Sequence, residues 1–412
     1  MKWLIRVSAG IAVAAALMAG IVYTRAHFDH EAAVESMNRG ELRVARVKLR
    51  KYLKVHSHDD QARLLLAEAL VTDGALVAED SAFDALEQLG RIRDESPVAA
   101  EARLRAARLQ LFILNEASTA EDSLAASVAL APDSHEAHYI SWRLLGLTGR
   151  ADFCEPHFWG TFESGPIEQR GARLREWYMS QFAPRTSNID LDRRMGFLGV
   201  TEPASPQAEL RRLNSFRSRQ ADSAVLQAAV ARWYLNEGVP RRALTVLQET
   251  VDSANGLESP FFVVTLIAVH MELGNFDEAG QYFDQWPKPR EGFEYWKWAG
   301  HIADEVRRDR ESAAAAFDKA LAIWPGPVDW SLRFRRAQCL ARTGKSEEAA
   351  SERARAAEIE KLMEKDVHLK IRNALSQLDN PQELGTLVEF YRALQRPREV
   401  KAWTEYIESL RQ

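Results

Sequence analysis

Cysteine is scarce in this sequence. The chain of 412 residues contains two, Cys154 and Cys339. Two thiols cannot form a disulfide framework or a four-thiolate zinc site. Both stand among helix-forming residues, so each is predicted to be a small core residue, and neither indicates a redox compartment.

An excess of positive charge is also missing. The sequence has 54 lysines and arginines against 59 aspartates and glutamates, which gives a formal net charge of −5. A general nucleic-acid binder usually carries a basic excess, so no nucleic-acid partner is predicted. With 46% hydrophobic and 27% charged residues, the composition is typical of an ordered protein, and the length suits two or three domains or one repeat array.

Signatures of catalysis are absent from the sequence. No Gly-rich phosphate loop follows a strand, and neither Gly-x-Ser-x-Gly nor His-Glu-x-x-His occurs. An enzyme built in the irregular stretch 160–220 would need an acid/base pair. Glu163, Glu168 and Asp190 are available there, but their arrangement does not indicate such a pair. The chain is therefore predicted not to be an enzyme, with no catalytic residues and no cofactor.

The one long apolar run lies at the N-terminus. Lys2 and Arg6 precede an uncharged stretch over residues 7–23. As a helix, this run would span roughly 25 Å, the short end for crossing a bilayer. Residues 1–25 are therefore predicted to be a single-pass membrane anchor or signal-anchor.

Two alternatives concern this N-terminal segment. It could be a signal peptide cleaved after Ala26, although the run is longer than most signal peptides have. Its orientation is also open, because Lys2 and Arg6 favour an inside start whereas Arg25 and Arg39 lie just beyond the run. We favour an uncleaved anchor with the body on the outer (periplasmic or extracytoplasmic) side.

One phrase recurs through the rest of the chain. In "GNFDEAGQYF" (274–283), a glycine is followed five residues later by a small residue and four further on by a large one. The same spacing of glycine, small residue and large residue begins at Gly40, Gly149 and Gly238. Strand-like alternation is almost absent, and amphipathic stretches of about twelve to sixteen residues predict helix pairs.

The repeated phrase has a physical reason. Two antiparallel helices pack closely only where one position is small, and a larger residue one turn later fills the space towards the next unit. The glycine supplies the left-handed conformation that ends the first helix. The predicted small positions are Ala45, Ala85, Ala120, Ala243, Ala279 and Ala313, and the large ones include Leu49, Phe283 and Phe317.

The phrase Gly-x-x-x-x-Ala-x-x-x-Phe-x-x-Ala-x-x-x-x-Pro resembles the second half of a tetratricopeptide repeat. "YWKWAGHIA" (295–303) offers Trp296, Ala299, Gly300 and Ala303 at the spacing of the first half. The resemblance covers most of residues 26–160 and 220–412. It implies an all-α, right-handed superhelical solenoid of antiparallel helix pairs that follows the membrane helix.

Departures from the repeat suggest a domain division. Bulky Trp142 stands where this family usually has a small residue, so the helices at 133–160 are expected to pack differently from the other pairs. Residues 160–220 break the repeat with a helix and a long loop. We predict an N-terminal lobe (26–160), an irregular helix-loop joint (161–220) and a C-terminal lobe (221–412), while a functional role for the break stays open.

Metal-ligand residue types gather at two places in the sequence. His135 and His138 on one helix face Cys154 and His157 on the next, and these are zinc-ligand residue types. Because Cys154 occupies the small packing position, a core role is favoured. In "HSHDD" (56–60), a helix-capping turn is favoured over metal binding. Arginine-rich stretches at 211–218 and 333–342 are predicted to be solvated helix faces, and most tryptophans to be core residues. No metal is predicted.

The resemblance implies a groove lined by first helices that binds a protein or peptide partner. Six first-helix residues are not used by the packing pattern and are the predicted groove residues: Arg232, Asn236, Met271, Glu272, Lys297 and His301. The family's carboxylate clamp is not matched, because His301 stands where the clamp has asparagine.

The function predicted from the sequence is a non-catalytic, membrane-anchored tetratricopeptide scaffold that mediates protein–protein interaction at a membrane surface, in a bacterial envelope. The alternative is a structural accessory subunit of an envelope or membrane enzyme complex. Stable co-purification in detergent would indicate the subunit, and transient peptide binding would indicate the scaffold.

Overall fold

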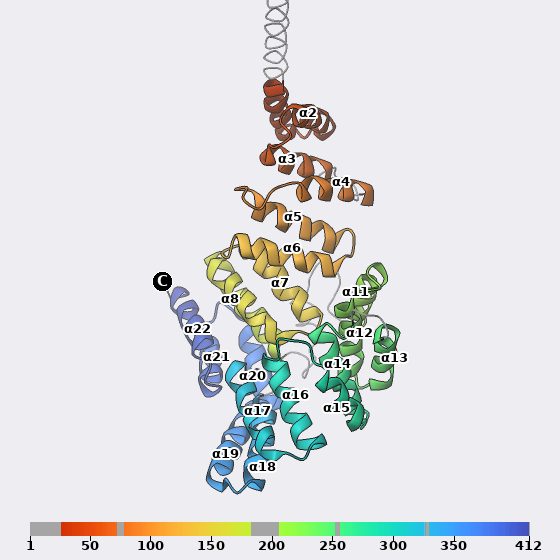
Figure 1. The fold of residues 1–412 in the computed structure, drawn as a ribbon. Coiled ribbons are helices and arrows are strands. Elements are labelled where there is room, and N and C mark those ends of the chain that lie inside the picture. The colour runs from red at the N-terminus through yellow and green to blue at the C-terminus, as the bar shows by residue number, and fades with distance from the viewer. Residues whose placement is uncertain are drawn as a thin grey trace, which may run out of the picture. The chain divides into compact units, whose positions relative to one another are not determined.

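A computed structural model describes residues 26–71, 78–182, 206–251, 256–324, 326 and 329–411. Every regular element in these ranges is helical, as the sequence predicts (Figure 1). The chain divides into two compact units, residues 1–137 and 138–412.

The first unit is a series of helices with short connections. After a helical segment at 26–38 come α2 (Leu42–Val55), α3 (Asp60–Val71), α4 (Glu79–Gly90), α5 (Ala99–Phe112) and α6 (Ala117–Leu130). The helix α7 (His135–Leu147) contains the boundary between the two units. Asp59, in the predicted capping turn, accepts a hydrogen bond from the Ala62 amide at 2.9 Å and so caps α3.

The second unit begins with α7 and an irregular part and continues as regular pairs. The irregular part holds η1 (Ala151–Phe153), α8 (Cys154–Ser164), η2 (Ile167–Gln169) and α9 (Arg170–Phe182). The helices that follow are α11 (Pro206–Arg219), α12 (Ala224–Asn236), α13 (Pro240–Val251), α14 (Pro260–Glu272), α15 (Phe276–Asp284), α16 (Phe293–His301) with the π-helical turn η4 (Ile302–Val306), α17 (Arg310–Ile323), α18 (Asp329–Arg342), α19 (Ser346–Leu362), α20 (Lys365–Leu375), α21 (Pro381–Ala393) and α22 (Pro397–Ser409).

The predicted packing rule is confirmed by burial. All six predicted small positions, from Ala45 to Ala313, have 0% exposure, and the large residues Leu49, Phe283 and Phe317 are buried. The turns also agree with the prediction, since Gly274 has φ +76° between α14 and α15. At the equivalent turn between α21 and α22, Gln395 takes φ +59°. The helix pair is therefore set by backbone geometry and one small residue, and glycine is not obligatory at the turn.

The irregular part of the second unit packs against the end of the chain. Trp177 and Tyr178 of α9 share one apolar cluster with residues of α20, α21 and α22, including Tyr391 and Trp403. Arg398 of α22 forms an ion pair with Glu163 of α8 at 2.6 Å. The two compact units divide between residues 137 and 138, whereas the lobe boundary predicted from the sequence is at residue 160. The helix of the predicted joint packs in the second unit, whereas the joint's loop, residues 183–205, lies outside the described residues.

Trp142 is accommodated despite its size. It has 0% exposure and packs edge-on against Phe158 and Trp177, with ring centroids 5.2 and 6.2 Å away. Cys154 is 3% exposed and lies against the Trp142 carbonyl, with 3.5 Å between sulfur and oxygen. An aromatic cluster therefore replaces the usual small-residue contact between α7 and α8.

Gly300 allows a close approach between α16 and α17. A Cβ atom at this position would lie 2.4 Å from Cε1 of Phe317, which is fully buried. Gly300→Ala is therefore expected to lower the free energy of unfolding by about 1–2 kcal/mol, because overpacking outweighs the gain in helix propensity. Denaturant unfolding measures the change. Gly385→Ala in α21 is the matched control, since nothing lies within 4 Å of its Cβ position, and equal effects of the two changes would contradict this account.

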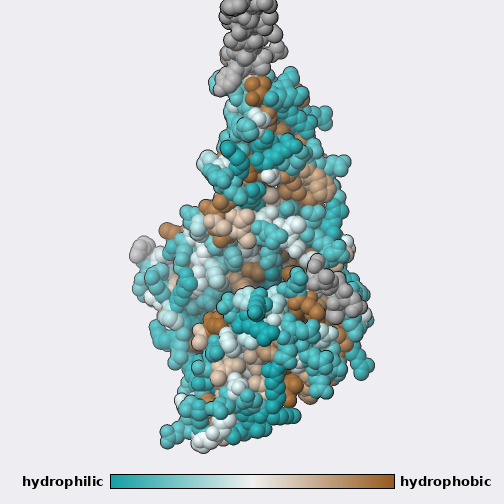
Figure 2. All heavy atoms as spheres, viewed as in Figure 1, coloured by the Kyte–Doolittle hydropathy of each residue, from teal (hydrophilic) through white to brown (hydrophobic). Residues whose placement is uncertain are grey.

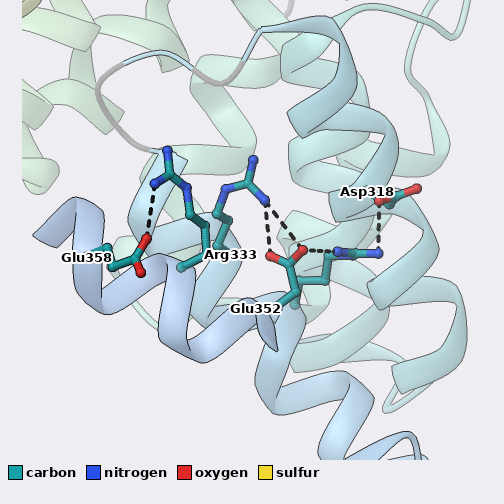
Figure 3. A network of polar contacts seen from close by, with 6 residues as sticks. Asp318, Arg333, Glu352 and Glu358 are labelled. Atoms are coloured by element: carbon teal, nitrogen blue, oxygen red, sulfur yellow. Dashed lines mark hydrogen bonds and ion pairs between the residues drawn. The ribbon is translucent and has the colours of Figure 1, made fainter. Parts of the chain in front are cut away.

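Figure 3 shows an ion-pair network between α17, α18 and α19. Glu352 accepts from Arg333 at 3.2 Å and from Arg336, and Arg336 also reaches Asp318 at 2.9 Å. The side chains of Glu352, Arg333 and Arg336 are 17%, 22% and 18% exposed. The prediction of a solvated face at 333–342 is thus wrong for Arg333 and Arg336. Both lie partly buried between the helices because they pair with Glu352 of α19.

Removing the shared acid is expected to destabilise this part of the unit. Glu352→Ala leaves two half-buried guanidinium groups without their carboxylate, which is expected to cost about 2 kcal/mol in free energy of unfolding. Chemical denaturation measures the loss. Glu358→Ala is the control, because Glu358 is exposed and pairs only with Arg355 within the described part of the chain. A loss at Glu352 no larger than at Glu358 would show that the network does not stabilise the fold.

The predicted anchor, residues 1–25, lies outside the described residues. Within the ranges that the structure describes, no helix combines the length and the apolar character needed to cross a bilayer.

Candidate protein-binding site

Five charged side chains from three parts of the second unit form a cluster, which we call the Arg232 cluster. They are Arg150 and Asp152 from the turn and η1 after α7, Arg232 from α12, and Glu294 and Lys297 from α16. Two of them, Arg232 and Lys297, are predicted groove residues.

Glu294 lies at the centre of this cluster. Its Oε1 is 3.7 Å from Nη1 of Arg232, and its Oε2 accepts from Lys297 Nζ at 3.2 Å and from Trp298 Nε1 at 3.1 Å. Burial acts to raise the pKa of Glu294, but Lys297 and Arg232 outweigh it, so the pKa is lowered. Glu294 is therefore ionised at neutral pH and links α12 to α16.

An aromatic ring of α14 supports the two arginines. The guanidinium carbons of Arg150 and Arg232 lie 5.5 and 5.4 Å from the centroid of the Phe261 ring. Gly149 makes room for the Arg232 stem, because a Cβ there would lie 3.0 Å from Arg232 Cγ. Cation–π contact and close packing thus hold both guanidinium groups in place.

Asp152 is the perturbed acid of the cluster. Burial and the nearby charge of Glu294 raise its pKa from 3.8 to about 6, while Arg232 and Lys297 oppose the rise. Near neutral pH the cluster therefore holds three cations against two carboxylates, and Asp152 takes up a proton when the pH falls below about 6.

Arg232 retains hydrogen-bonding capacity inside this cluster. Its Nε and Nη2 atoms are buried and have no hydrogen-bond partner within the described residues. A buried donor without an acceptor costs free energy. An oxygen atom that reached these nitrogens, from water or from a bound molecule, could accept their hydrogen bonds.

His301 belongs to a second polar group one turn further along the chain from Lys297. Its Nδ1 lies 3.2 Å from Oε1 of Glu305, which also pairs with Arg335 of α18. Burial lowers the pKa of His301, and the positive charges of Arg335 and Lys297 add to the effect, whereas Glu305 opposes it. First helices of successive pairs thus contribute polar side chains next to one another.

The other three predicted groove residues are placed differently. Asn236 and Glu272 are exposed at the last positions of α12 and α14. Met271 is half-buried and packs against an apolar cluster of the second unit, so it serves packing instead of lining a free surface.

Sequence reasoning missed Asp152, Arg150, Phe261 and Glu294. Glu294 carries a usable signal, because it stands three residues before Lys297 and therefore shares its face of the helix. Asp152 carries none, since η1 interrupts the repeat and only the fold brings it to α12 and α16.

The alternative sites from the sequence have structural roles where the structure describes them. His138 and His157 do meet, with 3.0 Å between their Nδ1 atoms, but Cys154 faces the core. Among the described residues, no group of three or more His, Cys, Asp or Glu could hold a metal ion. Of the candidate acids, Glu163 pairs with Arg398, Glu168 is exposed in η2, and Asp190 lies outside the described ranges.

Comparison with known proteins gives one family match. The sequence model of the tetratricopeptide repeat family matches residues 303–361, from η4 through α19. No curated protein matches the chain.

Several solved structures resemble the chain weakly. The TPR domain of P58(IPK) is 19% identical and covers 85% of this chain and 98% of its own, with a TM-score of 0.31. A tetratricopeptide repeat protein from Parabacteroides merdae is 15% identical and covers 74% of this chain and 93% of its own, with a TM-score of 0.30. The Cut9–Hcn1 structure is 14% identical and covers 93% of this chain and 89% of its own, with a TM-score of 0.35. The chain thus has a tetratricopeptide repeat match at residues 303–361 within a longer succession of helix pairs.

Proposed function

We propose that this chain is a non-catalytic, membrane-anchored scaffold whose second unit binds a segment of a partner protein at the Arg232 cluster. The observation that carries this proposal is the buried guanidinium of Arg232, two of whose nitrogens have no acceptor within the described residues. A partner's carbonyl or carboxylate oxygen would satisfy them.

Several features support binding of an extended protein segment. The cluster combines fixed cations with the Phe261 and Trp298 rings, and such a mixture suits a peptide with both polar and apolar groups. The first helices α12, α14 and α16 all contribute to it. Fold and family match are consistent with a protein-interaction role.

The membrane part of the proposal rests on the sequence. Residues 7–23 are uncharged and apolar and follow Lys2 and Arg6. We propose that they anchor the chain as a single-pass segment, with the body on the outer side of a bacterial membrane.

Site-specific crosslinking tests the binding proposal. A photoreactive residue at Asn236 is exposed and lies one turn from Arg232 on the same face of α12. In cells, it should capture one dominant protein, whereas a probe at exposed Gln281 of α15 should not. Arg232→Gln is expected to reduce capture at Asn236 at least several-fold.

Two results would oppose the proposal. Capture that is unchanged in Arg232→Gln would place the contact away from the cluster. Self-crosslinks and background alone would favour a structural subunit whose contacts lie elsewhere. A thermal melt of the Arg232→Gln protein shows whether the fold is intact, and Lys297→Gln provides a second variant of the same site.

A further inference from the structure

The helix α2 has an unusual charge. Among its fourteen residues it carries six basic side chains and no acidic one. The basic residues are Arg43, Arg46, Lys48, Arg50, Lys51 and Lys54. In a chain whose net charge is −5, this is a strong local excess of positive charge.

Three of these cations serve the fold of the first unit. Arg46 donates to the carbonyl of Ala69 at 2.7 Å, and Lys48 donates to the carbonyl of Ala32 at 3.2 Å. Arg50 pairs with Asp84 at 3.3 Å on the surface. Arg43, Lys51 and Lys54 are exposed and form no ion pair within the described part of the chain.

The outward face of α2 is apolar as well as basic. Ala45, Leu49 and Tyr52 are buried and face the unit's core. Val44, Val47 and Val55 point the other way, with exposures of 43%, 54% and 41%. In Figure 2 the surface around the position of α2 in Figure 1 is mainly hydrophilic, so the three valines are apolar side chains within a polar surface.

Helical spacing places these side chains together. Residues 44, 47, 51 and 55 are three or four positions apart and so follow one face. Arg43 and Lys54 both lie along one edge of this stripe, beside Val47. We call these six residues the α2 outer face: Arg43, Val44, Val47, Lys51, Lys54 and Val55.

We propose that the α2 outer face binds an anionic lipid surface. Valines between lysines and arginines suit the boundary of a bilayer, where apolar side chains enter the acyl region and cations contact phosphates. The proposal goes beyond protein binding at the Arg232 cluster, which lies in the other unit, but it rests on the proposed membrane placement of the chain.

Chain connectivity favours lipid over other acidic partners. Only eighteen residues lie between Tyr23, the end of the apolar run, and Leu42, the start of α2. If the run is anchored, this short connection keeps α2 near the bilayer, where the effective lipid concentration is high. The nearby acid Glu41 is paired with Arg39 at 3.5 Å, which limits local repulsion from phosphate groups.

An environment-sensitive label on the full chain tests the proposal. Val44→Cys is labelled with a nitrobenzoxadiazole dye, and Leu130→Cys of α6 is the matched control, since Leu130 is 40% exposed in the same unit. The native cysteines need no replacement, because both are buried. The labelled chain is placed in nanodiscs of phosphatidylcholine alone or with one-third phosphatidylglycerol.

The expected result is a blue-shifted, brighter emission at position 44 in the anionic discs only, with no change at position 130. Replacing Arg43, Lys51 and Lys54 with glutamine should abolish the change. Each cation near an anionic surface contributes roughly 1 kcal/mol of binding free energy. The triple variant should therefore bind anionic vesicles about 100-fold more weakly.

Two outcomes would overturn the proposal. One is equal emission at position 44 in both lipid compositions. The other is the same change produced in solution by polyglutamate or DNA without lipid, which would assign the face to an acidic macromolecule. If the chain does not enter discs, the anchor proposal fails, and adding the labelled chain to the same two compositions as vesicles still tests the α2 outer face.

Discussion

Replacing Trp177 with alanine is expected to lower the free energy of unfolding of the second unit by about 4 kcal/mol. The ring is 1% exposed and stacks on Phe158, with centroids 4.4 Å apart and planes 6° from parallel. Its Nε1 donates to Glu399 of α22 at 3.2 Å. The change therefore opens a large cavity and also removes the donor to a buried carboxyl group.

The effect at Trp177 separates two accounts of α9. If α9 is part of the second unit's core, guanidinium unfolding should show the full loss, and Trp177→Phe, which keeps a ring but lacks the donor, should lose about half as much. Phe334→Ala, at a 43% exposed position of α18, should cost under about 1 kcal/mol. If Trp177→Ala loses no more free energy of unfolding than Phe334→Ala, then α9 is not part of the second unit's core. That result would favour the prediction that α9 belongs to a joint between two lobes.

The paired helices were predictable because their determinants are local. One small residue, such as Ala279, and one turn glycine, such as Gly274, fix how two adjacent helices meet, and both are visible in a ten-residue phrase. The contact of α9 with α22 was not predictable in this way. Trp177 and Glu399 are 222 residues apart, and neither belongs to the repeated phrase.

The candidate site was predictable only in part, for a related reason. Arg232 and Lys297 stand on first helices at positions that packing does not use, so the repeat itself identifies them. Asp152 lies in η1, where the repeat is interrupted. Its approach to Glu294 depends on how the irregular part meets α12 and α16, and that information is not contained in any one segment.

Asp152 is expected to give the second unit a pH-dependent stability. Its pKa is raised to about 6 in the folded protein from an ordinary value of 3.8. Because the folded state holds the proton more tightly, the stabilisation is fully present below about pH 4 and is lost as the pH rises through 6. This rise in pKa corresponds to a change of at most about 3 kcal/mol in the free energy of unfolding, because Asp152 is only half-buried and solvent screens part of the interaction.

Asp152→Asn should remove this dependence, because the amide stays neutral at every pH. The free energy of unfolding of the full chain in detergent, measured between pH 4 and 7.5, should fall by up to about 3 kcal/mol more in the unaltered protein than in Asp152→Asn. Asp222→Asn, at an exposed position before α12, should leave the dependence unchanged. Since other titrating groups are common to all three proteins, most of their contributions cancel in this comparison. Glu294 is the exception, because its charge interacts with Asp152. If the free energy of unfolding varied with pH in the same way in Asp152→Asn and Asp222→Asn, Asp152 would not be held among the charges of the Arg232 cluster.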